Sequence, residues 1–363
     1  MTPGYPFDLV IFDCDGVLVD SERLINRIES QHLSRLGLDL SPDEARATFK
    51  GRTVPEIAAI AESQLHAKIP ADWLYDWGMH IALGFVTTLR PVASVQEVLD
   101  GLTTQRVATC VASQSPRARV DLALSVTNLA QYFDDRVYTA SLVPRGKPLP
   151  DLLLYSAARM GAEPGRCAVI EDSESGVQAA IAAGMSVFGY AADEDPAALR
   201  RAGATAFSSM RELPALLECD PGQRVGAPAE RASGSEPPAR LREAYRAFAA
   251  GDGRPLVQFL AEDVTYHLPG QHLGGGTVRG RAEVLERTAQ AALSCDAPPE
   301  IRLQRVVGFG EFVLSIERFV ARRCGRTVDQ DVCIVWRMTG AQCTEIWSTF
   351  SDQASCDRFW ECG

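Results

Sequence analysis

Residues 8–22 read DLVIFDCDGVLVDSE, and the rest of the chain is best understood from this segment. Its run of apolar and β-branched residues is typical of a buried strand, and Gly16 indicates a turn directly after it. Asp13 and Asp15 stand two residues apart at the strand's carboxyl end, so in an extended chain both carboxylates point to the same side. Such a pair suits a hard cation and a carboxylate nucleophile together. It is equally typical of a turn or a helix N-cap, so the pair alone leaves both interpretations open.

Four later segments repeat this strand character. They are RVATCVAS (106–113), DRVYTA (135–140), RCAVIED (166–172) and MSVFGY (185–190), and longer helical patterns separate them. This alternation predicts a parallel sheet with helices on both faces. Ligands of such sheets bind outside the carboxyl ends of the strands, so the polar residues after each run are candidates for one shared site.

The region from Ser21 to Thr88 interrupts the alternation. Apolar residues recur at three-to-four spacing in LINRIESQHLSRLGL (24–38) and PEIAAIAESQL (55–65), which predicts successive helices. Helices inserted after the first strand would lie over the ligand crevice, where they can act as a lid.

Charged residues of this insertion are candidates for substrate selection. Glu22, Arg52 and Lys50 are the residues concerned. Arg52 lies in the segment FKGRTVPEI, where a guanidinium can contact an anionic substrate. The same residues are also explained by the start of a helix at TVPE, so this role stays open.

Three further strand ends carry polar groups that suit phosphate and metal chemistry. Ser113 and Gln114 end the second strand and can hold a phosphate oxygen without adding charge, although a helix N-cap explains them equally well. Lys147 lies in the loop RGKPLP and can balance a phosphate, although a solvated lysine is also ordinary there. Glu171 and Asp172 follow the fourth strand, where their repulsion is costly without a bound cation. Capping of the next helix is the competing interpretation.

As a set, these strand ends resemble the four motifs of the haloacid dehalogenase superfamily of phosphohydrolases. The motifs look like Asp13-Cys14-Asp15-Gly16, Ser113, Lys147 and Glu171-Asp172, in the right order and each at a predicted strand end or in its following loop. The resemblance covers about residues 7–218. It implies an α/β Rossmann-like core with a helical cap inserted after the first motif, as in the β-phosphoglucomutase-like branch.

The resemblance also implies a role for each motif residue. Asp13 would attack phosphorus and become an aspartyl phosphate, and Asp15 would protonate the leaving alcohol and then activate water. Ser113 and Lys147 would hold the phosphoryl oxygens. Mg²⁺ would be bound by the Asp13 carboxylate, the Asp15 carbonyl, Asp172, and Glu171 directly or through water. The expected substrate contacts are Gly16, Glu22, Arg52 and Gln114.

Two positions specify the reaction within the superfamily. The first motif of true dehalogenases resembles Asp-x-Tyr and that of phosphonatases Asp-x-Ala, whereas this chain has Asp15 at the third position. Asp15 supplies the acid that an oxygen leaving group requires. Ile25 stands where β-phosphoglucomutases carry a cap-hinge histidine. We therefore expect hydrolysis of a small phosphorylated metabolite, with a sugar phosphate as one candidate. The alternatives are a phosphomutase, a bifunctional enzyme, and a binding protein on a retired phosphatase core, against which the complete motif set argues.

Composition places the chain among ordinary folded proteins. It has 363 residues, 46% of them apolar and 23% charged, and a net charge of -11 without a basic block, which disfavours nucleic-acid binding. It has no stretch of about 18 or more apolar residues and no secretory signal pattern, so we expect a cytoplasmic protein without membrane contact. The ten cysteines form no C-x-x-C pair, which argues against a zinc ribbon or a thioredoxin-type site.

The composition changes at PGQRVGAPAERASGSEPPAR (221–240), where four prolines and three glycines leave little to bury. This change predicts two domains joined by a linker. We assign the hydrolase to residues 1–220 (core 1–18 and 89–220, cap about 19–88), the linker to 221–239 and a second domain to 240–363.

The second domain has a different pattern. Helical patterns at 241–252, 255–263 and 280–293 precede strands from Glu300 onward, and the turns GFGE, CGRT and MTGA predict an antiparallel meander. This order resembles the SnoaL-like and ketosteroid-isomerase-like family of cone-shaped α+β barrels. The resemblance implies an apolar ligand pocket on the concave face and, since such barrels commonly pair, a homodimer.

Four polar residues are candidates for that pocket: Tyr266, His267, Asp331 and Glu345. His267 falls near the position where isomerase relatives place their catalytic carboxylate, and an imidazole there can act as a base near neutral pH. A packed, hydrogen-bonded core histidine is the alternative interpretation.

Overall fold

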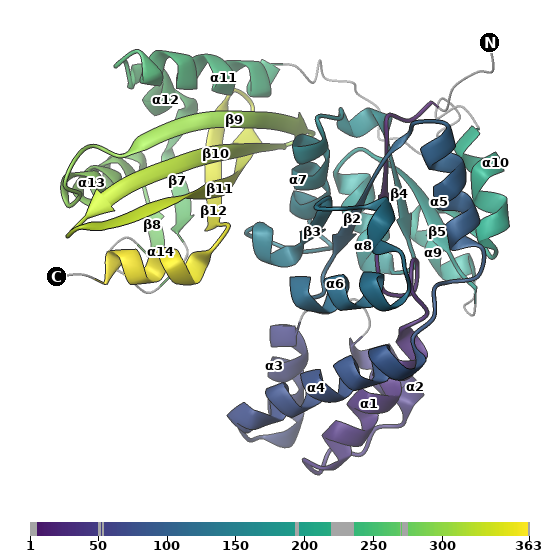
Figure 1. The fold of residues 1–363 in the computed structure, drawn as a ribbon. Coiled ribbons are helices and arrows are strands. Elements are labelled where there is room, and N and C mark those ends of the chain that lie inside the picture. Colours follow the sequence, from purple (N-terminus) through teal and green to yellow (C-terminus); the bar gives the residue numbers. More distant parts are fainter. Residues whose placement is uncertain are drawn as a thin grey trace.

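A computed structural model describes residues 6–49, 52, 54–192, 196–218, 236–268, 270 and 275–361. Within these residues the chain forms two six-stranded sheets, one in each half (Figure 1). The first sheet is parallel throughout, with strand order β3-β2-β1-β4-β5-β6. Its strands are β1 (Leu9–Phe12), β2 (Ala108–Ser113), β3 (Val137–Thr139), β4 (Cys167–Glu171), β5 (Ser186–Tyr190) and β6 (Thr205–Phe207).

The quoted first segment forms the centre of this sheet. β1 is buried along its whole length and pairs with β2 on one side and β4 on the other. This confirms the predicted α/β core, because a strand covered on both faces reads as a continuous apolar run. The sequence analysis did not predict β6, an edge strand of three residues that is too short to show a pattern.

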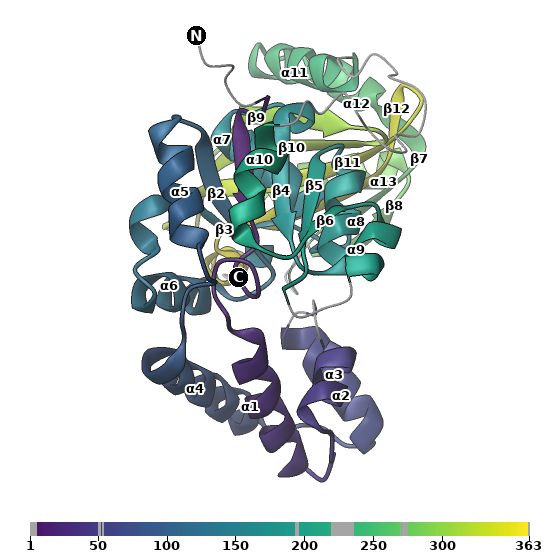
Figure 2. The same cartoon turned by 90° about the vertical axis from the view of Figure 1, so that its right-hand side faces the viewer.

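Helices cover both faces of the parallel sheet (Figures 1 and 2). They are α5 (Val95–Thr104), α6 (Arg117–Val126), α7 (Asp151–Met160), α8 (Glu174–Ala182), α9 (Pro196–Ala202) and α10 (Leu213–Glu218). In α7 every residue from Asp151 to Ala158 is buried. A helix that is buried all round has neighbours on both sides, and in this chain the outer neighbour is the second sheet.

The predicted helical insertion is present between β1 and β2. It contains α1 (Glu22–Ser34), α2 (Pro42–Phe49), α3 (Val54–Leu65) and α4 (Ala71–Thr88). Two connecting segments run side by side where it joins the core, since Val19 forms a bridge with Pro91 and Val92 N–H donates to the Leu18 carbonyl at 3.0 Å. Figure 2 shows the four helices as a separate layer at one end of the core. They form the cap over the carboxyl ends of the strands.

The second half is a mixed sheet, curved in Figure 1, with strand order β8-β7-β12-β11-β10-β9. Strands β9 to β12 form the predicted antiparallel meander, and β7 joins β12 in parallel. The elements are α11 (Glu236–Ala249), α12 (Arg254–Phe259), β7 (Leu260–Leu268), β8 (Gly276–Arg279), α13 (Arg281–Leu293), β9 (Glu300–Phe309), β10 (Phe312–Arg323), β11 (Arg326–Thr339), β12 (Gln342–Phe350) and α14 (Gln353–Trp360).

Two sequence assignments differ from the structure here. The helix predicted for residues 255–263 ends at Phe259, because Leu260 pairs with Cys343 and starts a strand. Pairing with a neighbouring strand has overridden the helical pattern. Helix α11 begins at Glu236, inside the range assigned to the linker, whose residues 221–235 lie outside the described part of the chain.

The convex face of the second sheet packs on α7, which lies between the two sheets in Figure 1. Leu314 and Ile316 of β10 belong to one apolar cluster with Leu152 and Leu154 of α7. The opposite, concave face holds a separate cluster that contains Val313 and Trp336. The two halves of the protein therefore share one core. No helix in the described segments is long and apolar enough to cross a membrane.

Candidate active site

Two carboxylates and one backbone carbonyl, from three strands of the first sheet, surround the ammonium group of Lys147. Its Nζ donates to Asp13 Oδ1 at 2.6 Å, to Glu171 Oε1, and to the carbonyl of Ala112 at 2.9 Å. Asp13 follows β1, Glu171 ends β4 and Ala112 lies in β2. These motif residues thus converge as the sequence predicted.

Lys147 is a buried cation between two carboxylates, with 2% of its side chain exposed. Burial acts to lower the pKa of Lys147, but Asp13 and Glu171 outweigh it and raise that pKa well above its ordinary value. The ammonium group therefore stays charged, which suits a group that faces phosphoryl oxygens.

Asp13 lacks enough positive charge around it. Burial, against the opposing effect of Lys147 and with a smaller contribution from Glu171, raises the pKa of its carboxyl group to about 7. A second cation beside Asp13 would restore the carboxylate that a nucleophile requires.

The donors around Asp13 fit a magnesium ion. Gly16 has a φ of +79°, and a Cβ atom at this position would lie 2.3 Å from Asp172 Oδ2, so only glycine lets that carboxylate approach the turn. Asp13, Asp172 and the Asp15 carbonyl would supply three oxygen ligands. Among the described residues no group of three or more His, Cys, Asp or Glu side chains is placed to hold a metal ion.

Glu171 lies beside Lys147 and the start of α8. Its Oε1 accepts from Lys147, and its Oε2 accepts from Ser173 Oγ at 2.9 Å and from the Asp172 N–H at 3.2 Å. Protein donors thus occupy both oxygens. Glu171 binds Lys147 and the start of α8, and its expected support of a metal ion, directly or through water, stays a prediction.

Asp15 is held by three donors. Its Oδ1 accepts from Ser21 Oγ at 2.5 Å, and its Oδ2 accepts from Ser115 Oγ at 2.6 Å and from Arg119 at 3.2 Å. Burial acts to raise the pKa of Asp15, but Arg119 and the two hydroxyls lower it. Asp15 is therefore a carboxylate here, in the state of a base.

Ser113 and Gln114 both lie at the site, with different functions. Ser113 is buried and its Oγ accepts from the Ser115 N–H at 3.1 Å. Gln114 grips the backbone of Lys147, since its Nε2 donates to the Lys147 carbonyl at 3.2 Å and its Oε1 accepts from the Lys147 N–H at 3.1 Å. Gln114 also lines the cavity at the site and holds the loop that carries the lysine.

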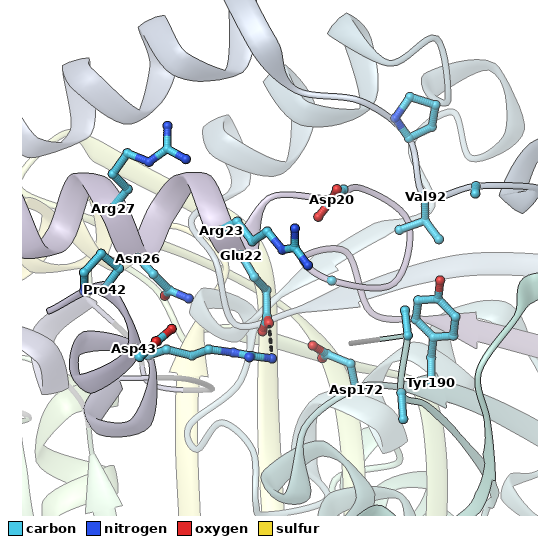
Figure 3. A pocket seen from close by; sticks show the side chains of 16 residues that line it. Asp20, Glu22, Arg23, Asn26, Arg27, Pro42, Asp43, Val92, Asp172 and Tyr190 are labelled. Atoms are coloured by element: carbon cyan, nitrogen blue, oxygen red, sulfur yellow. Dashed lines mark ion pairs between the residues drawn. The ribbon is translucent and has the colours of Figure 1, made fainter. Parts of the chain in front are cut away.

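Two adjoining cavities lie between cap and core. The smaller, of about 100 Å³, lies over Asp13 and Lys147. The larger, of about 670 Å³, lies between α1 and the end of β5. Figure 3 shows Glu22 and Asn26 from the cap and Asp172 and Tyr190 from the core around the larger space. Charged side chains of both signs line it, which suits a polar substrate.

The cap residues proposed from the sequence reach this region. Glu22 lines both cavities and forms an ion pair with Arg46 at 3.1 Å, drawn dashed in Figure 3. Arg52 is exposed and lines the smaller cavity. Lys50 lies outside the described residues.

Sequence reasoning missed Glu29 and Arg119. Glu29 of α1 is 4% exposed, lines the smaller cavity, and forms no hydrogen bond or ion pair with any described residue; burial raises its pKa to about 7. A signal was present, because Glu29 lies on the helix face that buries Ile25, Ile28 and Leu33. Arg119 lies one turn into α6, and nothing in its local pattern separates it from a surface arginine.

The second-domain residues chosen from the sequence do not gather in a pocket. His267 pairs with Glu345 at 3.0 Å and stacks on Trp347, with ring centroids 5.4 Å apart. Asp331 accepts from Arg159 of α7 at 2.7 Å. These side chains lie on the convex face with Val335, because residues two apart on a strand share a face. Only Tyr266 points inward, where it donates to Ser348 at 3.3 Å.

Other polar residues lie inside the cone. Glu317 of β10 is 4% exposed and accepts from the hydroxyl of Tyr245 and from Ser315 Oγ at 2.9 Å. Trp336 Nε1 donates to Ser315 at 2.9 Å. This buried network stabilises the interior of the second sheet, and the sequence analysis did not identify it.

Two family models match the chain. The model of haloacid dehalogenase-like hydrolases matches residues 10–190, and the model of SnoaL-like domains matches residues 241–346. Both matches lie where the sequence resemblances were found.

Similar proteins support the same division. The 6-phosphogluconate phosphatase of Escherichia coli is 30% identical over 58% of this chain and 94% of its own. A phosphorylated carbohydrates phosphatase of Thermotoga maritima is 30% identical over 58% of this chain and 98% of its own. A hydrolase of the same family from Deinococcus radiodurans, solved with bound phosphate and sodium, is 34% identical and has a TM-score of 0.50, covering 59% of this chain and 96% of its own.

Proposed function

The chain belongs to the haloacid dehalogenase-like hydrolases and is an enzyme with a fused SnoaL-like domain, and on this premise we propose its reaction. We propose that it is a Mg²⁺-dependent phosphomonoester hydrolase that forms an aspartyl phosphate. Its substrate is a small, polyhydroxylated phosphate ester of the sugar-phosphate class.

The observation that carries the proposal is the group around Lys147. A buried ammonium group lies 2.6 Å from Asp13, and the Asp172 carboxylate lies against Gly16, beside the proposed metal position. A third carboxylate, Asp15, is two residues along the chain from Asp13 and is held by Ser21. Phosphoryl transfer depends mainly on alignment and charge neutralisation, which this arrangement supplies.

In the first step an Asp13 oxygen attacks phosphorus, and the bond between phosphorus and the leaving alcohol breaks. Asp15 gives its proton to the leaving oxygen. The negative charge of an arriving phosphate ester raises the pKa of Asp15, which favours the protonated form that this step requires. Ser113 and Lys147 hold the phosphoryl oxygens.

In the second step water attacks phosphorus of the aspartyl phosphate. Asp15, now ionised, takes a proton from that water, and inorganic phosphate leaves with the bond to Asp13 broken. The donors Ser21, Ser115 and Arg119 favour the ionised form of Asp15 and so support its function as a base.

Asp13, Asp172 and the Asp15 carbonyl would hold Mg²⁺. The bound ion supplies positive charge that offsets the phosphoryl and carboxylate charges. The raised pKa of Asp13 supports this assignment, because the protein alone leaves that carboxyl group short of positive charge.

Two residues in the smaller cavity support the substrate and the reaction type. Among the described residues no hydrogen-bond donor contacts the buried carboxyl group of Glu29, and hydroxyl groups of a polyol phosphate would supply one. Ile25 lines the same cavity where a mutase would need an acid–base group, which favours transfer to water. The two phosphatase relatives, named for phosphorylated carbohydrates and 6-phosphogluconate, agree with this class.

The first test is Asp13→Asn in the full-length protein. Without the nucleophile, Mg²⁺-dependent phosphate release from p-nitrophenyl phosphate should fall by at least about 10³-fold while the circular dichroism spectrum is unchanged. A panel of sugar and polyol phosphates, assayed for inorganic phosphate, would then identify the preferred substrate.

Asp8→Asn is the matched control, because Asp8 precedes the same strand but pairs with Arg166 at the surface. It should keep wild-type turnover. Undiminished phosphate release by Asp13→Asn would exclude Asp13 as the nucleophile.

A further inference from the structure

The loop that carries Lys147 is held from two sides. On the inner side Gln114 bonds both the N–H and the carbonyl of Lys147. Gly146 allows this approach, since a Cβ atom there would lie 2.3 Å from Gln114 Oε1. The position of the catalytic ammonium group therefore depends on the backbone of residues 145–147.

On the outer side the loop is held through Arg145. The guanidinium donates twice to Asp151, at 2.9 and 2.8 Å, and the Asp151 side chain is fully buried. This pair ties the loop to the first turn of α7. Only 16% of the Arg145 side chain is exposed, because another part of the chain covers it.

The covering residues belong to the SnoaL-like domain. The Arg145 guanidinium lies over the ring of Trp347, 3.7 Å from its centroid, and 5.1 Å from the ring centroid of Phe312. The His267 ring stacks on Trp347, with an angle of 12° between the ring planes, and His267 bonds Glu345. Trp347 is thus fixed by its own sheet.

We propose that the SnoaL-like domain positions the catalytic lysine of the phosphatase. Trp347 fixes Arg145, Arg145 fixes the loop, and the loop sets Lys147 against Asp13. Trp347 and Arg145 are positioning residues in this proposal, which rests on the phosphatase function proposed above. A flat guanidinium between a buried carboxylate and an indole ring has little freedom to move, and this is the property that a loop bearing a catalytic group requires.

Trp347→Leu in the full-length protein tests the proposal. Leucine keeps an apolar side chain but removes the stacking surface, so the loop gains freedom. We expect kcat for p-nitrophenyl phosphate to fall about tenfold with little change in KM. A displacement of about 1 Å costs on the order of a hundredfold, and a loosened loop that Gln114 still holds should displace Lys147 by less than that. Hydrogen–deuterium exchange of residues 143–150 should become faster. Trp347→Phe, which keeps a ring, should restore most of both properties.

Arg159→Gln is the matched control. It removes the 2.7 Å ion pair to Asp331, which also joins the two domains, and leaves the stack on Arg145 in place. We expect wild-type kcat and wild-type exchange in residues 143–150. An equal loss of kcat in Arg159→Gln and Trp347→Leu would overturn the proposal, because domain docking in general would then explain the effect.

Arg145→Lys gives a second measurement if Trp347→Leu fails to fold. Lysine keeps a charge for Asp151 and loses the flat stacking surface, so kcat should fall and exchange in the loop should rise. Wild-type kcat and exchange in a folded variant of either residue would refute the proposal. The exchange comparison needs no substrate, so it remains decisive if the wild-type protein releases no phosphate, an outcome that would count against the phosphatase function alone.

Discussion

Glu317 is a carboxyl group that titrates inside the second sheet. Burial raises its pKa from 4.5 to about 7, although hydrogen bonds from Tyr245 and Ser315 act in the other direction. Because the folded-state pKa is the higher one, its contribution to stability is complete below pH 4.5 and is lost as the pH rises through 7. The glutamate therefore destabilises the fold in alkaline solution.

Glu317→Gln should remove this pH dependence. The quantity to compare is the free energy of unfolding of the variant minus that of the wild type. This difference should be larger at pH 8 than at pH 5, by up to about 3 kcal/mol. Urea unfolding at the two pH values measures the difference, and other titrating groups cancel because both proteins contain them. Identical pH dependence in the two proteins would contradict the raised pKa.

At the residue scale, the sequence predicted the groups at strand ends and Glu22 at the start of α1, and it missed two groups within helices. Asp13 and Lys147 could be placed because parallel strands end at one edge. Glu29 and Arg119 reach the site from α1 and α6, so their positions depend on how those helices pack. His267 and Glu345 were expected in the pocket of the concave face, but their side chains lie on the convex face, because adjacent residues of a strand point to opposite faces.

The turn after β1 belongs to the element scale. Gly16 holds a left-handed conformation at φ +79°, and Asp172 occupies the space that a side chain would need. Alanine at this position is strained by about 1–2 kcal/mol and also displaces the Asp172 carboxylate.

Gly16→Ala should therefore lower stability by that amount and weaken Mg²⁺ activation by at least about tenfold. Gly161→Ala is the control, since Gly161 has a similar φ of +71° with no atom within 4 Å of a built Cβ. It should show the strain alone, with unchanged Mg²⁺ dependence of phosphate release. Equal Mg²⁺ dependence in both variants would show that Asp172 does not need the space.

Helix α7 was also predictable in part. Its sequence DLLLYSAARM lacks a polar outer face, and the structure buries eight consecutive residues of it, Asp151–Ala158. An all-round apolar helix indicates a covering layer. The sequence could not identify that layer. Strand β10 of the second sheet begins at Phe312, far along the chain from the end of α7 at Met160, and the sheet presents its convex face only after folding.

At the scale of the whole molecule, Leu314 tests how the two halves are joined. It is fully buried on the convex face, in the cluster that includes α7, whereas its neighbour Val313 is buried in the concave cluster. Leu314→Ala should cost about 2–5 kcal/mol and speed hydrogen exchange in both α7 and β10.

Val313→Ala is the counterpart on the other face. It should speed exchange within the second sheet and leave α7 protected. Unchanged exchange of α7 in Leu314→Ala would show that the cluster does not couple the two halves. The homodimer expected from the sequence stays a prediction, and a second copy would have to bind a surface that α7 leaves uncovered.

The shared core has a practical consequence for anyone who dissects this enzyme. A truncated protein that ends before the linker would expose to water the apolar side of α7 that the second sheet covers. Arg145 would also lose its contact with the indole ring of Trp347. Such a fragment should aggregate during purification, and the fraction that does not aggregate should have a low kcat. Loss of activity on truncation would then result from the lost support of α7 and Arg145. It should not be taken as proof that the SnoaL-like domain catalyses a reaction of its own.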